Sequence, residues 1–508
     1  MTRTEKFMSN TIASAAYQMV VMIVGLITPR IMLVAYGSEI NGLVSSITQF
    51  VSYFVIVEAG LSGAAVYSLY KPLADKDHDG ISSIVTATRD FYYKSGFVFI
   101  GMLVLLAAVY PIFVKTDMLS PALIAILVFV LGFNKIIDFF LLAKYRAILT
   151  ADQRSYIISI GSIISTVINL IIIVVLAKYG INIVLLKTVA ILSVIFRSCY
   201  LYFYSMKKYS YVNLKAKPNV SALSKRWNAF YLQLLQIVQK GTPTILITFF
   251  STLQNVSIYS IFNMVITGLS SLLDIFMSGL SASFGDILSR KDMKVLHKAY
   301  RDFEFSYYGL ITIVYSVALI LIMPFVRIYT SDIVDANYNQ PIVGILFILN
   351  AYLYNIKTPQ GMLVISAGHF KETQKQSTIQ VLCIIIPGII LVPQIGIAGI
   401  LIALIISNIY RDIDLLFYIP KKVTKLPVME TFLRIVRSVI TMVITVIPAG
   451  FIFNMVMSGY IEWILYAIAV LIYSIVVWIA VSFVSDRKQL VSVLGRFKNM
   501  INAKFKRL

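Results

Sequence analysis

Long apolar runs recur from one end of this 508-residue sequence to the other, and they constrain the fold more than any other feature. A helix of about 20 apolar residues crosses the hydrocarbon core of a bilayer, whereas the strands of a membrane barrel are shorter and alternate in polarity. Hydrophobic residues make up 59% of the chain and charged residues only 13%, against about 45–50% and about 25% in soluble domains. We therefore predict an all-α polytopic membrane protein.

The apolar runs predict fourteen transmembrane helices separated by short polar loops. They cover residues 10–35, 43–67, 89–113, 120–143, 155–177, 181–206, 226–250, 257–288, 303–327, 341–366, 378–392, 400–420, 432–457 and 462–484. Because the loops are short, we expect no large domain outside the membrane. The sequence also shows no cleavable signal, since residues 1–9 lead directly into a long apolar run.

Lysine and arginine are distributed very unevenly over the loops. The N-terminus, every second loop and the C-terminal tail, counted with Arg89 and Arg226 at the span edges, together hold 31 of them, and the opposite side, counted with Arg327 at a span edge, holds only Lys115, Lys178 and Arg327. Cytoplasmic loops carry the excess of positive charge in membrane proteins. The pattern predicts that both termini are cytoplasmic, and it accounts for the net charge of +21 without a nucleic-acid partner.

The tail after Val484 is basic and amphipathic. Its apolar residues follow helical spacing among lysines and arginines: Leu490, Val493, Leu494, Phe497, Ile501 and Phe505. This pattern is typical of a helix that lies on anionic membrane lipids, and the alternative is a solvated tail.

Two stretches half a chain apart resemble each other. They read "GLSGAAVYSLYKPLADKDHDGISSIVTATRDFYYKSG" at 60–96 and "GLSASFGDILSRKDMKVLHKAYRDFEFSYYG" at 279–309. Each places Gly-Leu-Ser in one span, then a charged loop, then Arg-Asp-Phe at the start of the next span. The stretches are six spans apart, and an even offset gives both copies the same direction through the membrane. The sequence therefore predicts a parallel internal repeat.

Four cations lie deep in predicted spans, and the repeat pairs Arg30 with Lys240 and Lys135 with Lys357. A charge at the centre of a membrane helix costs about 2.5–3.5 kcal/mol. Three of the four adjoin a Thr-Pro pair, at which we expect the helix to kink. We therefore expect the four to face water, a partner or a ligand, in a water-filled chamber between the two halves.

Other charges in the spans lie nearer the ends. We expect Arg411, Arg434 and Arg437 to extend toward the membrane surface, and Lys187 and Arg197 to be structural.

Ion pairing is the alternative role for each deep cation. Asp138 lies one helical turn from Lys135. Glu58 and Asp274, in repeat-related spans, are the other carboxylates, and they could pair with a cation or bind a coupling ion. Gln233 and Gln236 share a helical face with Lys240 and could bind sugar hydroxyls or a neighbouring helix. The candidate substrate residues are thus Arg30, Lys135, Lys240, Lys357, Gln233 and Gln236, and the candidates for ion coupling or internal pairing are Glu58, Asp138 and Asp274.

No pattern in the sequence indicates an enzyme or a cofactor. Cys199 and Cys383 are far apart, and the histidines at 78, 297 and 369 show no metal-ligand spacing. No Ser/His/Asp set, paired loop carboxylates or Walker phosphate loop is evident. We therefore predict no catalytic residues, no metal and no cofactor.

Three motifs resemble those of a known family of polysaccharide flippases. "TPRIMLVAYGSEINGLVSSITQF" (28–50) is similar to its N-terminal signature, with Gly37, Glu39 and Gly42 in place and Asn41 where an aromatic residue is commoner. "YRAILTADQRSYI" (145–157) resembles the loop after the fourth helix, and "VSIYSIFNMV" (256–265) resembles the start of the eighth.

The family belongs to the multidrug/oligosaccharidyl-lipid/polysaccharide exporter superfamily. The resemblance implies two pseudo-symmetric six-helix lobes, at 1–206 and 226–420, around a central cavity. A cytoplasmic linker (207–225) joins them, and two extra helices (421–484) and the basic tail (485–508) follow. It implies alternating-access transport of undecaprenyl-diphosphate-linked oligosaccharide from the inner to the outer leaflet of the bacterial cytoplasmic membrane. H⁺ or Na⁺ would drive the transport, and a polysaccharide polymerase and glycosyltransferases would be further partners.

Several other functions stay open on the sequence. A lipid II flippase would carry a substrate with the same diphosphate anchor. A multidrug or cation antiporter of the same superfamily would be expected to have a more acidic cavity. A membrane-bound glycan polymerase or ligase would usually carry a large outer loop, which is absent here, and a relative that has lost transport is a further alternative.

Overall fold

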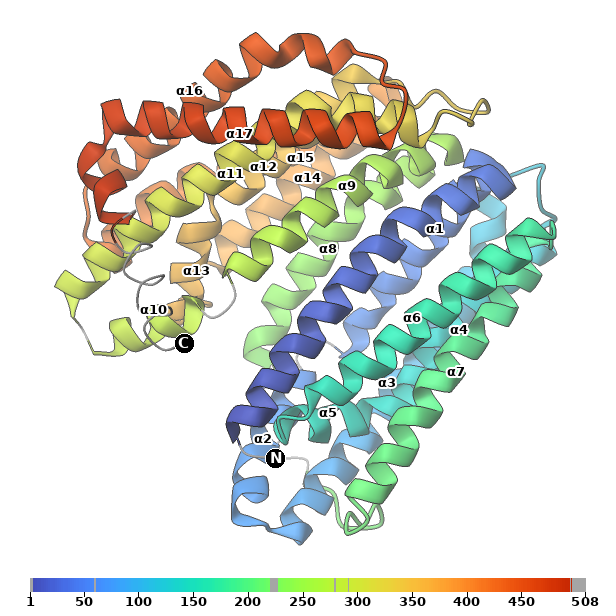
Figure 1. Ribbon diagram of the computed structural model, residues 1–508. Coiled ribbons are helices and arrows are strands. Elements are labelled where there is room, and N and C mark those ends of the chain that lie inside the picture. Colours follow the sequence, from blue (N-terminus) through green and yellow to red (C-terminus); the bar gives the residue numbers. More distant parts are fainter. Residues whose placement is uncertain are drawn as a thin grey trace. The chain divides into compact units, whose positions relative to one another are not determined.

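The computed structural model describes residues 3–58, 61–219, 227–277, 280–290, 292–493 and 495. All regular secondary structure in this part of the chain is helical (Figure 1). Eleven of the helical segments are long and apolar enough to cross a membrane. The prediction of an all-α, multi-pass membrane protein is therefore confirmed.

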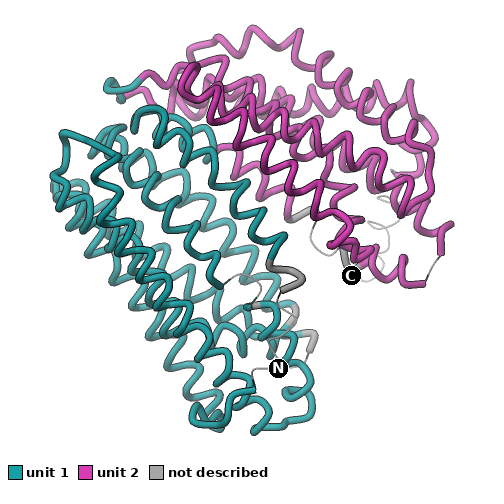
Figure 2. The backbone as a smooth tube through the Cα atoms, turned by 180° about the vertical axis from the view of Figure 1, so that it is seen from behind, with its two compact units in different colours: residues 1–264, 333–336 teal, residues 265–332, 337–508 magenta. Residues whose placement is uncertain are grey.

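The helices form two compact units (Figure 2). Unit 1 comprises Met1–Met264 and Ile333–Ala336, and unit 2 comprises Val265–Asp332 and Asn337–Leu508. The boundary at Met264 lies inside α9 (Leu253–Met277). This division rests on spatial contacts, whereas the lobes predicted above follow the sequence repeat, so those lobes stay a prediction.

Unit 1 is built from the first eight α-helices and the beginning of α9. They are α1 (Arg3–Phe54), α2 (Leu61–Asp75), α3 (His78–Phe113), α4 (Pro121–Ile137), α5 (Ala143–Ala151), α6 (Ser155–Lys178), α7 (Ile183–Lys208) and α8 (Trp227–Phe250). A 3₁₀ turn, η1 (Val55–Glu58), follows α1, and a π-helical turn, η2 (Asp138–Leu142), joins α4 to α5.

The first two predicted spans form one long helix with a sharp bend at Gly37. Gly37 has a φ of 78°, which favours glycine, and a Cβ at this position would lie 2.8 Å from an Asp335 carboxylate oxygen. The backbone N–H of Ser38 donates to that carboxylate at 2.6 Å, and its hydroxyl donates at 2.7 Å. Asp335 therefore satisfies the first free N–H group of the second half of α1, as a helix N-cap does.

A polar cluster fastens α1, the α5–α6 turn and the end of α7 together. Lys6 donates to Asp152 at 2.7 Å, Arg154 at 2.6 Å and Tyr209 at 2.9 Å. Burial by itself raises the pKa of Asp152, but the hydrogen bonds from Lys6, Arg154 and Tyr209 bring that pKa below its ordinary value.

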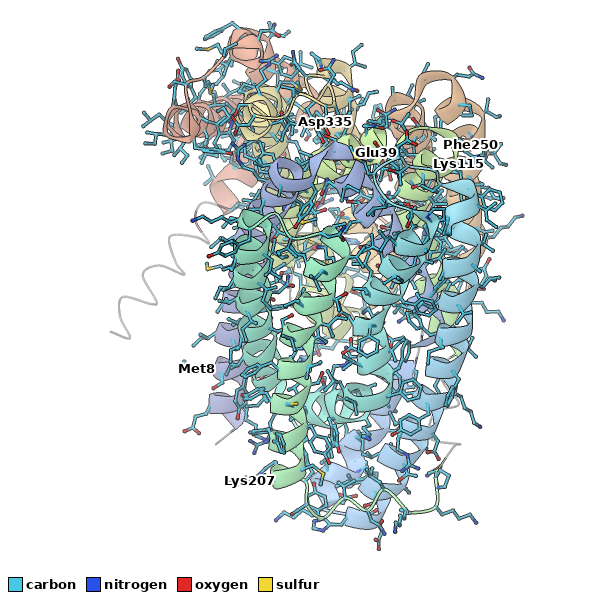
Figure 3. The ribbon with its side chains drawn as sticks, turned by 90° about the vertical axis from the view of Figure 1, so that its right-hand side faces the viewer. Met8, Glu39, Lys115, Lys207, Phe250 and Asp335 are labelled. Carbon is cyan, nitrogen blue, oxygen red and sulfur yellow. The ribbon has the colours of Figure 1, made fainter. Side chains whose placement is uncertain are left out.

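The two ends of unit 1 are distinguished by the residues they carry (Figure 3). Met8 and Lys207 lie toward one end, whereas Glu39, Lys115 and Asp335 lie at the other. The first end is that of the Lys6–Asp152 cluster, because Met8 follows Lys6 closely and Lys207 precedes Tyr209 closely in the chain.

Unit 2 contains the remainder of α9 and eight further α-helices. They are α10 (Leu280–Ser289), α11 (Met293–Tyr329), α12 (Pro341–Ile356), α13 (Thr358–Ser366), α14 (Gln374–Ile395), α15 (Ile397–Ile419), α16 (Val428–Ala449) and α17 (Tyr460–Ser485). A π-helical turn (Pro420–Thr424) extends α15, and a 3₁₀ turn (Gly450–Asn454) extends α16. Gly399 allows α15 to approach α14 closely, since a Cβ there would lie 2.5 Å from the Leu391 backbone.

The two repeat stretches form the same local structure. In unit 1 the short α2 precedes α3, whose first turn is capped by Asp77 through the N–H of Gly80 at 2.8 Å. In unit 2 the short α10 precedes α11, capped by Asp292 through the N–H of Val295 at 3.0 Å. The resemblance in sequence therefore corresponds to a resemblance in structure.

One of the three Thr-Pro pairs coincides with a break between two helices, and the kinks expected at the other two stay a prediction. Helices α1 and α8 continue through Pro29 and Pro243, whereas the chain leaves α12 at Ile356 and enters α13 at Thr358. A proline removes only one N–H donor from the helix, and neighbouring hydrogen bonds can maintain it. The bend in α1 described above is at Gly37.

Two predicted surface segments fold back on the protein. Residues 209–219, part of the predicted linker, return to α3, where Arg89 donates to the Leu214 carbonyl at 2.8 Å. Leu490 and Val493 in the tail are buried against Phe305, so these two apolar side chains pack on protein rather than on lipid. Residues 220–226, 494 and 496–508 lie outside the described part of the chain.

Candidate functional site

The predicted site residues are divided between the two units. Unit 2 holds Lys357 and Asp274, and unit 1 holds the others: Arg30, Lys135, Lys240, Gln233, Gln236, Glu58 and Asp138. Each unit is described here by itself, and the gathering of the four cations around one cavity stays a prediction.

The polar stripe of α8 is exposed within unit 1. Gln233, Gln236 and Lys240 all present exposed side chains, and Lys240 makes no ion pair with any described residue. The other face of α8 packs on α1, where Tyr53 donates to the Val238 carbonyl at 2.8 Å. Close contact with α1 therefore fixes the rotation of α8 and leaves the stripe exposed. Arg30, on α1, is half-buried.

Asp138 is the centre of a charged cluster where η2 begins. Arg197 from α7 donates to its Oδ1 at 2.8 Å, Arg146 Nη1 lies 3.8 Å from its Oδ2, and Lys135 Nζ lies 4.0 Å from the same oxygen. The pair with Lys135 that helical spacing suggested is thus present, but it is the longest of the three. Sequence reasoning missed Arg146, which lies more than one helical turn beyond Asp138 in the chain, and treated Arg197 as structural, since it lies 59 residues from Asp138.

Glu58 belongs to the same cluster. It interacts electrostatically with Arg146, Lys135 and Asp138. The cluster therefore combines three cations with two carboxylates and has a net charge of +1. The π-helical turn at its centre is a feature often found at functional sites.

Lys357 lies at the break between α12 and α13. Its Nζ donates to Asn408 Oδ1 on α15 and lies 4.6 Å from the centroid of the Tyr354 ring. Asp412, also on α15, interacts with it electrostatically. Asp274, by contrast, is exposed and interacts with Tyr307, Tyr315 and Tyr354.

The carboxylate near Lys357 was thus absent from the sequence prediction, which offered Glu58 and Asp274. A usable signal existed: Asp412 is an acidic residue within a predicted span. Its neighbour Arg411 was instead interpreted as a cation near the helix end that extends to the membrane surface.

Two arginines expected to extend to the membrane surface are buried. Arg411 is 7% exposed and bonds Asp414 at 2.6 Å, and Arg434 is 8% exposed and bonds Glu304 at 2.5 Å. The expectation was wrong because a carboxylate lies close to each guanidinium, which makes burial tolerable. Arg437, the third, is partly exposed and bonds Asp486 at 3.1 Å.

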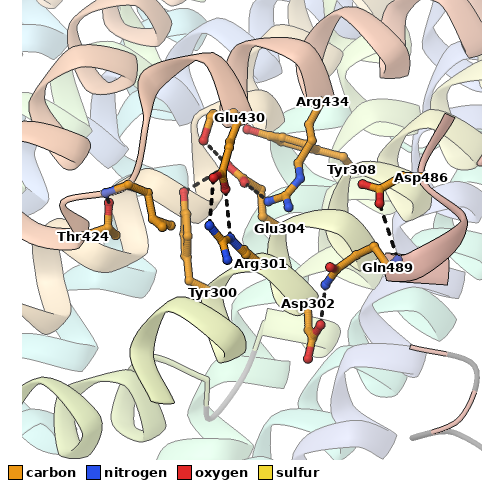
Figure 4. A network of polar contacts seen from close by, with 12 residues as sticks. Tyr300, Arg301, Asp302, Glu304, Tyr308, Thr424, Glu430, Arg434, Asp486 and Gln489 are labelled. Atoms are coloured by element: carbon orange, nitrogen blue, oxygen red, sulfur yellow. Dashed lines mark hydrogen bonds and ion pairs between the residues drawn. The ribbon is translucent and has the colours of Figure 1, made fainter. Parts of the chain in front are cut away.

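The Arg434–Glu304 pair belongs to a network between α11 and α16 (Figure 4). Glu304 also accepts from Tyr300 at 3.1 Å and from Thr431 at 2.9 Å. One turn away, Arg301 makes two bonds of 2.7–2.8 Å to Glu430. These contacts hold α16 against α11, and each of the two arginines is paired with a glutamate.

The chemistry available at these sites is electrostatic. Lysine and arginine side chains at membrane depth can attract phosphate and hold it by charge-assisted hydrogen bonds. Among the described residues, no group of three or more His, Cys, Asp or Glu side chains could hold a metal ion.

Comparison with known proteins places the chain by its fold. No protein-family model and no curated protein sequence matches it. Among solved structures, the lipid II flippase MurJ in an inward closed conformation superposes with a TM-score of 0.67 at 17% identity, covering 94% of this chain and 98% of that one. An inward-facing multidrug resistance MATE family transporter of the MOP superfamily gives a TM-score of 0.60 at 13% identity, covering 79% and 96%.

A third structure, a MATE transporter in complex with MaD3S, gives a TM-score of 0.54 at 12% identity and covers 78% of this chain and 93% of that one. At such identities the likeness concerns the fold alone. This multi-pass membrane protein has the fold of the multidrug/oligosaccharidyl-lipid/polysaccharide (MOP) exporter superfamily.

Proposed function

We propose that the protein is a flippase that moves undecaprenyl-diphosphate-linked oligosaccharide repeat units from the inner to the outer leaflet of the bacterial cytoplasmic membrane. Transport would proceed by alternating access, coupled to H⁺ or Na⁺, and would supply surface polysaccharide synthesis. The observation that carries the proposal is the stripe of α8, in which Lys240 is exposed and makes no ion pair with a described residue.

An unneutralised ammonium in a membrane helix costs about 2.5–3.5 kcal/mol. A diphosphate headgroup would compensate that charge, and Gln233 and Gln236, on the same face, could donate hydrogen bonds to phosphate or sugar oxygens. Arg30, Lys135 and Lys357 are the further cations proposed for the diphosphate. A cationic drug, in contrast, would be repelled by this set.

The helix count supports a flippase with two helices beyond two six-helix lobes. One of the eleven membrane segments, Met8–Glu58, bends at Gly37 and so covers two predicted spans. Helices α8 and α15, with 24 and 23 residues, coincide with the seventh and twelfth predicted spans. These segments and helices correspond to the fourteen spans predicted above, with α16 and α17 as the last two, and the count itself stays a prediction. The separation of Lys207 from Lys115 in unit 1 agrees with the proposal of a cytoplasmic N-terminus.

Lipid II is the second candidate substrate. The solved lipid II flippase covers 94% of this chain, whereas the MATE transporters cover 78–79%. Lipid II would contact the same cations through its diphosphate, so substitutions at these cations do not distinguish lipid II from an oligosaccharide repeat unit. Genetic complementation distinguishes the two substrates.

The test is alanine substitution at Arg30, Lys135, Lys240 and Lys357, with export of surface glycan measured at matched protein level in the native host. We expect Lys240→Ala to lower export at least tenfold, since about 1.4 kcal/mol of lost binding in the transition state suffices for that. Lys215→Ala, in the exposed segment after α7, is the matched control. Full export in all four variants would refute the proposal. Rescue of a strain depleted of its lipid II flippase would favour lipid II.

A further inference from the structure

Asp412 is a carboxylate in α15, which coincides with a predicted transmembrane span, and it has few groups to stabilise its charge. Its Oδ1 is buried and has no hydrogen-bond partner among the described residues. Of the charged groups in the described part of the chain, Lys357 is the one that interacts with it. A carboxylate in such a place is stable as an anion only while its counter-ion remains charged and near.

The remaining surroundings of Asp412 are neutral or already paired. Tyr308 on α11 and Tyr352 on α12 lie within electrostatic range of it. Its neighbour Arg411 bonds Asp414 at 2.6 Å. No charged side chain of α13, α14 or α16 in the described part of the chain interacts with it. Lys357 therefore decides whether Asp412 is charged or protonated.

The ammonium of Lys357 lies where it can interact with Asp412 and with a second anion. It does not form a direct ion pair with Asp412, because its Nζ donates to Asn408 Oδ1 and lies over the Tyr354 ring. It also stands at the junction of α12 and α13, where no continuous helix fixes its backbone on both sides. A modest change at this junction would alter the distance between the ammonium and Asp412.

We propose that Asp412 is the proton-binding residue of the transport cycle, and that it takes up a proton when an isoprenoid diphosphate draws the charge of Lys357 to itself. This inference rests on the proposed function. In the step, one H⁺ from the aqueous phase bonds to a carboxylate oxygen of Asp412, Lys357 keeps its own proton, and no other bond changes. Lys357 thus exchanges the Asp412 anion for the anion of the substrate. Proton uptake by Asp412 therefore follows anion binding.

A proton fits this site better than Na⁺ does. A sodium ion at Asp412 would be repelled by the ammonium of Lys357, and Asn408 Oδ1, the nearby neutral oxygen ligand, already accepts from that ammonium. A proton needs only a lone pair on Asp412. The structure therefore favours proton over sodium coupling.

The test uses the full-length protein, purified in lipid nanodiscs, with farnesyl diphosphate as a soluble isoprenoid diphosphate. Calorimetric titration in two buffers of different ionisation enthalpy gives the number of protons taken up per ligand bound. We expect wild type to take up close to one more proton than Asp412→Asn. The variant should bind roughly tenfold more tightly, because Lys357 then has no internal competitor. Asp286→Asn, which removes an exposed carboxylate of α10 paired with the exposed Arg290, is the matched control and should behave as wild type.

The outcomes separate the inference from the function on which it rests. If wild type does not bind farnesyl diphosphate, the proposed substrate class is wrong and the coupling fails with it. If wild type binds but Asp412→Asn takes up the same number of protons, only the coupling is refuted. Replacing choline by sodium should leave wild-type affinity unchanged, and a large increase would assign Asp412 to Na⁺ instead. If Asp412→Asn does not fold, the double variant Lys357→Gln/Asp412→Asn, which is neutral as the native pair is, takes its place. It too should take up close to one proton fewer per ligand bound than wild type.

Discussion

Glu304 and Glu430 offer a direct measure of what burial does to an ion pair in this protein. Each carboxylate joins α11 to α16 through an arginine, and the two pairs lie one helical turn apart along these helices. Glu304 is fully buried and Arg434 is 8% exposed, whereas the side chains of Arg301 and Glu430 are 39% and 32% exposed. The two sites therefore differ mainly in their access to solvent.

Glu304→Gln would leave the Arg434 guanidinium buried without a counter-ion. Removing one partner of a buried pair costs about 3–5 kcal/mol, whereas an exposed pair contributes about 1 kcal/mol or less. At roughly 2–4 °C per kcal/mol, Glu304→Gln should lower the melting temperature by on the order of 10 °C, and Glu430→Gln by no more than about 4 °C. Thermal melting of the detergent-purified variants, followed by tryptophan fluorescence, measures both shifts.

A double variant separates the effect of losing the ion pair from the effect of leaving one charge buried without a counter-ion. Replacing a buried ion pair by apolar residues of similar size is often neutral or stabilising. Glu304→Met/Arg434→Met should therefore melt well above Glu304→Gln. Equal shifts for Glu304→Gln and Glu430→Gln, or a double variant no better than Glu304→Gln, would refute the reasoning that buried charge controls stability here.

Further predictions concern unit 1. Gly42→Ala should prevent correct folding or lower the yield of folded protein severely, because its Cβ would lie 1.8 Å from the Leu253 carbonyl oxygen. Gly25→Ala, with no atom within 4 Å, is the control and should fold at wild-type yield. Asp152→Asn should lower the melting temperature at neutral pH, since it weakens the bond to Lys6. Folding lowers the pKa of Asp152, so its stabilisation is complete above about pH 4 and is lost as the pH falls through the lowered pKa. The difference in melting temperature between wild type and Asp152→Asn should accordingly become smaller below about pH 4. A difference in melting temperature that is constant with pH would contradict this account.

Features that depend on nearby residues were predictable from the sequence. Apolar runs gave the positions of the helices, because the need to satisfy backbone hydrogen bonds in lipid leaves a helix as the solution for each run. The repeat was visible because both copies keep Gly-Leu-Ser, a charged loop and Arg-Asp-Phe in the same order, and the structure adds that Asp77 and Asp292 cap corresponding helices. The bend at Gly37 was missed, since it depends on Asp335, almost 300 residues further along the chain.

Charge pairing was predictable only within one helical turn. Helical spacing placed Lys135 beside Asp138, but the shorter contact of Asp138 is with Arg197, 59 residues away. Arg434 meets Glu304 across 130 residues. A position near the end of a span suggested an arginine extended to the surface, and nothing local in the sequence could reveal the buried carboxylate that receives it.

Pairing divides the membrane cations into two groups with different consequences. Arg434 and Arg197 each contact a carboxylate, so they stabilise helix packing, and binding another anion would require displacing the first. Lys240 contacts no carboxylate of the described residues, and Lys357 shares Asp412 only at a distance. A charge that is not neutralised by the fold raises the free energy of the folded state. Loss of the charge at Lys240 should therefore be neutral or favourable for folding, whereas loss of Glu304 should be harmful, and the residues whose charge does not serve folding are the ones best placed to serve the proposed transport.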